Sequence, residues 1–228
     1  MNLIPIPKYI PILKGKLKGK KWLVSAGGKI VRLMFSTYEP EQSHLFEINI
    51  KPGHVVFDVG AHAGYYSLLA SALVGREGKV FAFEPNPHNY LSLVNHVKIN
   101  RADNIDVFEC AVGNENGYSL FELGSGSGTG HLSQFGDFRV RTIRLDDLVK
   151  EKELSPDFIK IDTEGAELLV LMGAKQLLSE IRPVVFLSTH GDEIHNQCCV
   201  FLQALNYRLK PIIGSDVHNT RELVCYPL

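Results

Sequence analysis

The feature that most constrains the fold of this chain is a regular alternation, from residue 54 onward, of short apolar runs with longer amphipathic segments. The apolar runs are rich in β-branched and aromatic residues and read as continuous, which is typical of strands buried on both faces. We therefore predict an α/β domain with a mostly parallel sheet covered by helices on both faces. Its central strands are expected at Val55–Val59, Lys79–Phe83, Ile105–Glu109, Phe158–Ile161 and Val184–Leu187.

Two segments between these runs have the pattern of covering helices. Asn86 is a suitable N-cap and Pro87 suits the first helical position. Apolar residues then recur at i, i+3, i+4 and i+7 from Tyr90 to Val97. The segment Ile194–Leu205 also carries apolar residues at helical spacing. Each segment predicts a helix with one apolar face against the sheet.

A length of 228 residues suits one domain with an extension, since domains commonly have about 150 residues. We expect residues 51–228 to form the main domain and residues 1–50 to pack on it. Within the extension, two apolar stretches flank a glycine pair typical of a hairpin turn, and a helix follows. These parts are Lys21–Ala26, Gly27-Gly28, Ile30–Ser36 and residues 39–50.

Charge is divided unevenly along the chain. The first 38 residues contain 8 Lys and Arg and no Asp or Glu, whereas the other 190 contain 16 basic and 25 acidic side chains. We expect the acidic body to repel nucleic acid. Six lysines between Lys8 and Lys21 form a basic arm, which is either a solvated segment or a weak contact for an anionic surface.

The sequence lacks the signals of a membrane or exported protein. No apolar run reaches the ~20 residues that cross a bilayer, and Pro5, Pro7 and Pro11 interrupt the start, where a signal peptide needs an apolar stretch. The four cysteines show no CxxC spacing and are too few to crosslink a chain of this length. We therefore expect a cytoplasmic protein with reduced thiols.

A glycine-rich turn follows the first predicted strand. Residues 55–64 read VVFDVGAHAG, so a strand with Asp58 near its end leads through Gly60 and Gly64 into a helix. Such a turn lets a ligand approach the backbone at a helix N-terminus. The GxxxG spacing and the lack of a following Lys-Ser or Lys-Thr argue against dinucleotides and triphosphates. Asp58 instead suits a ligand with an ammonium group; the alternative is a turn with no ligand.

A second acid stands one strand–helix unit later. Residues 79–87 read KVFAFEPNP and place Glu84 at the carboxyl end of the next strand. A carboxylate there accepts the two ribose hydroxyls of a nucleoside. A single Glu at a strand end would more often cap a helix or face solvent, but its spacing from Asp58 favours a pair that binds one ligand. The small apolar residues 110–112 are candidates for a wall facing adenine.

Several sequence blocks together resemble the FkbM family of S-adenosylmethionine-dependent methyltransferases across most of residues 54–210. The most specific blocks are DVGAHAG at 58–64, FEPNP at 83–87 and KIDTEGAE at 160–167. The resemblance implies a class I methyltransferase (Rossmann-like) fold with a seven-stranded, mostly parallel sheet whose last strand is antiparallel. It also implies S-adenosyl-L-methionine as the cofactor, with Asp58, Gly60, Gly64 and Glu84 as binding positions. Further candidates for cofactor binding are His62, Pro85, Ala111 and Asp162.

Two residues depart from the family pattern: His62 stands where Asn is usual, and Ser188 stands where many members have Glu.

Three residues are candidates for the chemistry of the methyl acceptor. Asp162 and Glu164 follow one predicted strand and His190 follows another, so all three are expected at one sheet edge. A hydroxyl is a poor nucleophile until a base or a metal removes its proton. We expect Asp162 or His190 to be that base and expect no metal, since only Asp162 and Glu164 are obvious ligands. The alternative is that the acids cap a helix and His190 closes a strand.

Two other patterns are weaker. His190, His195, Cys198 and Cys199 could be drawn as a metal set. Cys198, however, lies on the apolar stripe of its predicted helix, and buried free cysteine usually packs as a small hydrophobic side chain. Residues 124–130 read GSGSGTG, which is either a hairpin tip or a lid over the acceptor.

The expected function is methyl transfer to a hydroxyl of a sugar, a glycan or a secondary metabolite. N-methylation of a peptide or small molecule is an alternative, as is a non-catalytic module that binds S-adenosylmethionine. A sensor would need the cofactor residues but not Asp162 and Glu164, which favours an enzyme. The chain has no Asn/Asp-Pro-Pro-Tyr motif, which argues against methylation of flipped bases.

Overall fold

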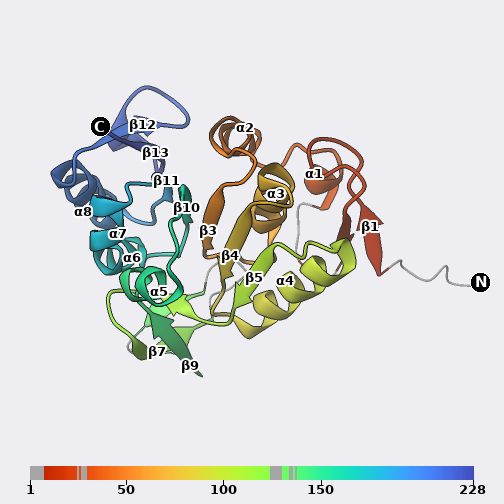
Figure 1. Ribbon diagram of the computed structural model, residues 1–228, viewed down its shortest axis with the longest axis horizontal. Coiled ribbons are helices and arrows are strands. Elements are labelled where there is room, and N and C mark those ends of the chain that lie inside the picture. Colours follow the sequence, from red (N-terminus) through yellow and green to blue (C-terminus); the bar gives the residue numbers. More distant parts are fainter. Residues whose placement is uncertain (1–7, 25, 27–29, 124–129, 134–135, 137) are drawn as a thin grey trace, which may run out of the picture.

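The computed structural model describes residues 8–24, 26, 30–123, 130–133, 136 and 138–228. Its centre is a seven-stranded sheet, shown in Figure 1. The strands are β3 (Val55–Val59), β4 (Lys79–Phe83), β5 (Ile105–Phe108), β10 (Phe158–Ile161), β11 (Val184–Ser188), β12 (Tyr207–Pro211) and β13 (Glu222–Pro227).

The strand order is β12-β13-β11-β10-β3-β4-β5. β13 runs antiparallel to both of its neighbours, and the other strand pairs are parallel. The predicted α/β fold with a mostly parallel sheet and an antiparallel last strand is therefore confirmed. All five predicted central strands are present, with ends that differ by at most one residue from the prediction.

Helices cover both faces of this sheet (Figure 1). One face carries α2 (Pro40–Asn49), α3 (Tyr65–Val74) and α4 (Pro87–Asn100). The other carries α5 (Leu145–Lys152), α6 (Glu167–Gly173), α7 (Lys175–Glu180) and α8 (Asp192–Ala204). The predicted N-cap of α4 is present, because the Asn86 side chain accepts hydrogen bonds from the backbone N–H groups of His88 and Asn89.

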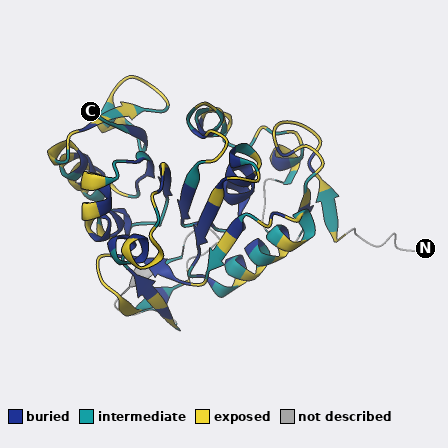
Figure 2. Ribbon diagram, viewed as in Figure 1, coloured by how far each residue is buried: buried dark blue, intermediate teal, exposed yellow. Residues whose placement is uncertain are grey.

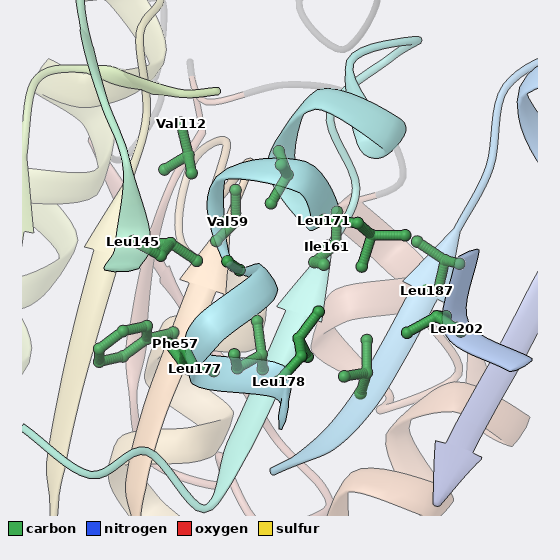
Figure 3. Close-up of a cluster of buried hydrophobic side chains, with 14 of the residues drawn as sticks. Phe57, Val59, Val112, Leu145, Ile161, Leu171, Leu177, Leu178, Leu187 and Leu202 are labelled. Atoms are coloured by element: carbon green, nitrogen blue, oxygen red, sulfur yellow. The ribbon is translucent and has the colours of Figure 1, made fainter. Parts of the chain in front are cut away.

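Neighbouring residues of each central strand point to opposite faces, which divides the core into two clusters. Phe57 and Val59 pack with Leu171 and Leu177 of the α5–α8 face, as Figure 3 shows. Val56 lies in the other cluster, on the α2–α4 face. Both faces of the central strands are therefore buried, in agreement with their continuous apolar sequence, and Figure 2 shows these strands largely in the colour of buried residues.

A second, four-stranded sheet follows β5, where the sequence pattern predicted no strands. Its order is β6-β9-β7-β8. β7 and β8, which precede and follow the Gly/Ser segment in the sequence, pair as antiparallel neighbours. Residues 124–129 of that segment lie outside the described residues, so neither a hairpin tip nor a lid is established there. The strands are β6 (Ala111–Val112), β7 (Gly117–Glu122), β8 (His131–Ser133) and β9 (Phe138–Ile143).

The structure corrects the predicted hairpin in the extension. β2 (Lys21–Leu23) pairs with β1 (Tyr9–Pro11), and residues Ile30–Met34 form the short helix α1 instead of a second strand. Residues 27–29 lie outside the described residues. β2 pairs with the segment before it because this pairing buries Ile12 and Leu17, which lie in and around the β1–β2 connection. Both side chains pack with Trp22 in the core on the α2–α4 face. The helix predicted over residues 39–50 is present as α2.

His96 of α4 joins the extension to the main domain. Its ring stacks on Trp22, with ring centroids 4.0 Å apart, and its Nε2 accepts the backbone N–H of Leu23 at 2.8 Å. Its Nδ1–H therefore donates to the carbonyl oxygen of Ala63 at 2.7 Å. Burial lowers the pKa of His96 to about 4, so the ring is neutral. The extension is thus tied directly to the glycine-rich turn.

The short 3-10 helix η1 (Val217–Asn219) lies between β12 and β13. Among the described residues, no helix combines the length and the apolar character that a membrane span needs.

Candidate active site

A cavity of about 470 Å³ opens at the carboxyl ends of the parallel strands. This edge is where open α/β sheets bind ligands, and the volume lies in the range of small-molecule sites. Residues from the glycine turn, from the ends of β4, β10 and β11, and from the extension line it together.

The predicted site residues that line the cavity are Gly60, His62, Glu84, Pro85, Ala111, Asp162, Glu164 and His190. Asp58 and Gly64 are not among the lining residues.

The glycine turn needs both of its glycines, for different reasons. Gly60 has φ 79°, and a Cβ there would collide with the backbone carbonyl of Asp162. Gly64 has φ 92°, and a Cβ there would collide with Leu93 of α4. Gly60 therefore lets the turn approach the end of β10, whereas Gly64 lets α3 pack against α4. His62 between them adopts φ 50°, a left-handed conformation that Asn and His tolerate better than most residues.

Asp58 is not part of the cavity wall and lies on the α3 side of the sheet. It lies opposite Lys160 in the β3–β10 register, and both are almost fully buried. Ser67 of α3 donates to Asp58 at 2.6 Å, and the Lys160 ammonium lies 3.8 Å from the other carboxylate oxygen. Asp58 is thus paired with the protein's own ammonium group. This differs from the contact with a ligand ammonium that the sequence suggested.

Lys160 links Asp58 to the cavity wall. Its Nζ donates to Asp162 at 3.1 Å and lies 5.1 Å from the centroid of the Tyr66 ring. Burial acts to lower the pKa of Lys160, but the carboxylates of Asp162 and Asp58 outweigh burial and raise the pKa above its usual value. The ammonium therefore stays charged and holds Asp162 in place.

Glu84 is a buried carboxylate in the cavity wall. Its oxygens accept the backbone N–H groups of His62 at 2.7 Å and Asn86 at 2.9 Å. Burial raises the pKa of Glu84 to about 7, against the effect of these hydrogen bonds. Ionised, the two oxygens have about four acceptor positions, so capacity remains for a ligand hydroxyl. Ala111 and its neighbours Cys110 and Val112 form a small apolar part of the wall. That this part faces adenine stays a prediction.

Asp162, Glu164 and His190 are brought together at the other part of the wall. Nε2 of His190 lies 3.4 Å from Glu164 and 3.9 Å from Asp162. Nδ1 of the same ring lies 3.0 Å from Oε1 of Glu167, which is fully buried at the start of α6. The same Glu167 oxygen accepts the backbone N–H of Gly165 at 2.9 Å. Glu167, which the sequence reasoning did not single out, therefore orients His190.

Carboxylates on both sides of the ring set the protonation of His190. Carboxylate oxygens face both ring nitrogens, an arrangement that favours a proton on each nitrogen. The hydrogen bond that His190 donates to Glu167 and the nearby charges of Glu164 and Asp162 raise the pKa of His190 to about 9, against the effect of burial. His190 is therefore an imidazolium at neutral pH and has no lone pair for a substrate proton. Burial raises the pKa of Glu164, which makes that carboxylate a better proton acceptor.

These three side chains could also hold a metal ion. Asp162, Glu164 and His190 each offer one ligand atom, and the atoms lie within 4.8 Å of one another. The sequence indicated Asp162 and Glu164 as possible metal ligands, and the fold brings His190 beside them as a third possible ligand.

The weaker set of His190, His195, Cys198 and Cys199, which the sequence argued against, does not form a candidate metal site among the described residues. All four cysteines are free and buried. His195 places Nδ1 at 2.8 Å from the Thr189 hydroxyl and Nε2 at 2.8 Å from the Val217 carbonyl oxygen, and the Cys199 Sγ lies 3.5 Å from the same Nε2.

The sequence analysis considered only the glycine turn and the ends of the predicted strands. It did not identify the cavity residues that come from β13 and from the extension. Glu222 is the first residue of β13 and lies opposite Ser188 in the register. Ser188 donates to its carboxylate at 2.8 Å, so this wall has an acid close to the position where Ser188 departs from the family pattern. The extension adds Trp22, Leu33, Tyr38, Glu39 and Gln42. No local sequence signal identified these, because their partners are distant in the chain.

Comparison with known proteins agrees with this geometry. The sequence model of a family described as "Methyltransferase FkbM domain" matches residues 58–209. A hexuronic acid methyltransferase, AglP, of Haloferax volcanii is 31% identical over 135 residues, which cover 58% of this chain and 54% of the relative. A 2-O-methyltransferase, NoeI, of Sinorhizobium fredii is 29% identical over 153 residues, which cover 58% of this chain and 62% of the relative. The chain thus spans about half to three fifths of these relatives' lengths.

Solved structures show the same fold at low sequence identity. A methyltransferase FkbM from Methylobacillus flagellatus superposes with a TM-score of 0.57 and 18% identity, covering 81% of this chain and 50% of that one. A fibrillarin from Aeropyrum pernix, solved with S-adenosyl-L-methionine, gives a TM-score of 0.51 and 14% identity, covering 82% of this chain and 73% of that one.

Proposed function

This chain belongs to the FkbM methyltransferase family, and from this premise we propose that it transfers a methyl group from S-adenosyl-L-methionine to a hydroxyl oxygen of a sugar or glycan. The observation that carries the proposal is that one cavity contains both a nucleoside-type carboxylate, Glu84, and the Asp162–Glu164–His190 cluster. The names of two relatives, for a hexuronic acid and for 2-O-methylation, support a sugar hydroxyl as the acceptor.

The residues present fit S-adenosylmethionine. Glu84 has acceptor capacity for ribose hydroxyls, the turn at Gly60 has no side chain, and Ala111 contributes an apolar surface. When bound, the cofactor supplies an electrophilic methyl group on its sulfonium sulfur. The protein's part is then to position the acceptor oxygen and to take up its proton.

The two carboxylates of the cluster, rather than His190, are the proton acceptors that the geometry supports. Asp162 is held by Lys160 at 3.1 Å, and the pKa of Glu164 is raised by burial toward the range in which a base operates. His190, protonated and anchored on Glu167, contributes positive charge that orients both acids. The hydroxyl proton passes to a carboxylate oxygen of this pair as the acceptor oxygen gains the methyl group.

Methyl transfer is tested directly with purified protein, S-adenosylmethionine carrying a deuterated methyl group, and a set of methyl glycosides. Mass spectrometry of the products is expected to show the label on a hydroxyl oxygen of a glycoside and release of S-adenosylhomocysteine. Failure to bind S-adenosylmethionine would overturn the proposal. Label that appears only on amino groups of amino sugars or peptides would replace it with N-methylation.

A further inference from the structure

Gln42, near the start of α2, places a buried side-chain amide in the cavity wall. Gln42 is only 9% exposed and lines the cavity, and its Oε1 has no hydrogen-bond partner among the described residues. A buried amide without a hydrogen bond is costly, so such groups usually have a partner in the functional state. A ligand hydroxyl in the cavity would supply that partner.

Glu39 lies one helical turn before Gln42 and also lines the cavity. Tyr66 donates its hydroxyl to the Glu39 carboxylate at 2.7 Å, and Tyr38 forms a side-chain hydrogen bond with the same acid. Glu39 itself adopts φ 42°, a left-handed conformation that a non-glycine residue seldom takes. Two tyrosines and the helix start therefore hold a carboxylate at the wall, with acceptor capacity left over.

Glu222 adds a third acceptor group from the opposite end of the chain. Ser188 uses its hydroxyl as a donor to Glu222 at 2.8 Å, and both residues line the cavity. Glu222 lines the same cavity as Glu39 and Gln42, and besides burial the charge of Glu39 contributes to the raised pKa of Glu222.

Negative charge dominates the wall of this cavity. Glu39, Asp162, Glu164 and Glu222 contribute carboxylates. The cations are already engaged, since Lys160 is buried between Asp58 and Asp162 and His190 lies among three carboxylates. Among the described residues of the cavity wall, an anionic ligand would therefore meet like charges, and the Lys160 and His190 cations there are already paired.

We propose that Glu39 and Gln42 of α2, together with Glu222 of β13, form the subsite for the acceptor's sugar ring, and that this subsite takes an uncharged polyhydroxyl ring and rejects a uronic acid. The inference rests on the proposed function and names its substrate class more narrowly. All three groups are hydrogen-bond acceptors, so they suit the hydroxyl donors of a neutral sugar. All three lie outside the family-matched residues 58–209.

The test uses matched pairs of probes that differ only at C6. Binding of methyl β-D-glucoside and methyl β-D-glucuronoside, and of the corresponding galactoside and galacturonoside, is measured by NMR titration of the full chain at pH 8. Titrations are run with and without saturating S-adenosylhomocysteine. At this pH the Glu222 carboxylate is ionised, because burial raises its pKa only to about 7. We expect a neutral glycoside to bind at least about tenfold more tightly than its acidic counterpart.

Three variants locate the subsite. Gln42→Met removes the amide at nearly constant size and is expected to weaken neutral-glycoside binding about three- to tenfold, as for loss of one neutral hydrogen bond. Glu39→Gln is expected to reduce the ratio of neutral-glycoside affinity to acidic-glycoside affinity, because it removes one negative charge from the subsite. Glu41→Gln is the matched control, because Glu41 is exposed on the same helix and does not line the cavity. S-adenosylhomocysteine affinity, expected to change less than twofold in all three, reports that each variant is folded.

Equal or tighter binding of the glucuronoside or galacturonoside would overturn the proposal. Binding of none of the four glycosides by protein that binds S-adenosylhomocysteine would also overturn it, while leaving the proposed function intact. Loss of S-adenosylhomocysteine binding by the wild type would instead contradict the proposed function. If Gln42→Met binds the neutral glycosides as tightly as the wild type does, Gln42 is not part of the subsite and the proposal is wrong in its central contact.

Discussion

Glu84 at the end of β4 accepts the backbone N–H of His62 at 2.7 Å, and this contact ties the second strand end to the glycine turn that follows β3. The contact orients a buried carboxylate toward the cavity without using a side chain of the turn. A backbone donor keeps this role whichever residue occupies position 62, so the departure from the usual Asn leaves the Glu84 contact in place.

Replacing Glu84 with Ala should weaken S-adenosylmethionine binding by ~10²-fold or more. Each hydrogen bond from a ribose hydroxyl to the carboxylate contributes about 1.5–3 kcal/mol, and 1.4 kcal/mol is tenfold in affinity. Titration calorimetry measures the change, and Glu84→Gln, which keeps the shape and one acceptor oxygen, should fall in between. A change below threefold would remove Glu84 from the cofactor site. Nicotinamide dinucleotides should not bind.

Cofactor affinity should rise with pH across neutrality. Burial raises the pKa of Glu84 to about 7, so the carboxylate that accepts ribose hydroxyls predominates above that pH and is lost below it. If only the ionised form binds, affinity should increase about tenfold from pH 6 to pH 8. Calorimetry at pH 6, 7 and 8 checks this, with Glu84→Gln expected to lack the trend. A flat profile in the wild type would show that Glu84 does not titrate in this range.

Asp162→Asn and Glu164→Gln should bind S-adenosylmethionine nearly normally yet turn over slowly. Loss of a general base typically costs ~10²–10⁴ in rate, and these carboxylates face the acceptor part of the cavity. His190→Ala should also be slow, because it removes the cation that lies within 4 Å of both acids. Single-turnover rates and cofactor titrations separate the two effects. Full activity in both acid variants would exclude the pair as the proton acceptor.

Saturating EDTA should leave the wild type active. Lys160 and protonated His190 already supply positive charge to the Asp162–Glu164 pair, so the arrangement of this pair requires no divalent ion. Activity is compared before and after extensive dialysis against the chelator. Complete loss, restored by Mg²⁺ or Mn²⁺, would reassign Asp162, Glu164 and His190 as metal ligands, a role that their spacing permits.

Replacing Lys14, Lys16 and Lys18 with Gln should leave cofactor affinity unchanged. These side chains are exposed and do not line the cavity. Lys20 and Lys21 are better left in place for this test, because Lys20 Nζ and the Lys21 backbone bond to Asn100 of α4. Any effect should appear with vesicles of anionic lipid and fade with salt, as the Debye length falls to ~8 Å at 0.15 M. Altered cofactor affinity would contradict the prediction.

Local sequence determined much of the sheet and part of the site. The five central strands were predictable because continuous apolar runs must be buried on both faces. The start of α4 was predictable because Asn86 and Pro87 have local backbone preferences. Glu84, Asp162, Glu164 and His190 could be placed at one edge, because the carboxyl ends of parallel strands meet there. Each of these inferences depends on residues close together in the chain or on a rule of the fold.

Only the tertiary structure decided which side chains complete the cavity. Asp58 pairs with Lys160 because the two residues lie opposite each other in the β3–β10 register. The sequence of β3 alone does not state which residue of the neighbouring strand lies opposite Asp58. Ser188 and Glu222 meet because β13 is inserted antiparallel beside β11. Glu39 and Gln42 reach the cavity because Phe46 packs α2 against Tyr66, Phe158 and Phe186. These contacts join distant segments, so local preference and spacing carry no information about them, and packing of the whole chain decides them.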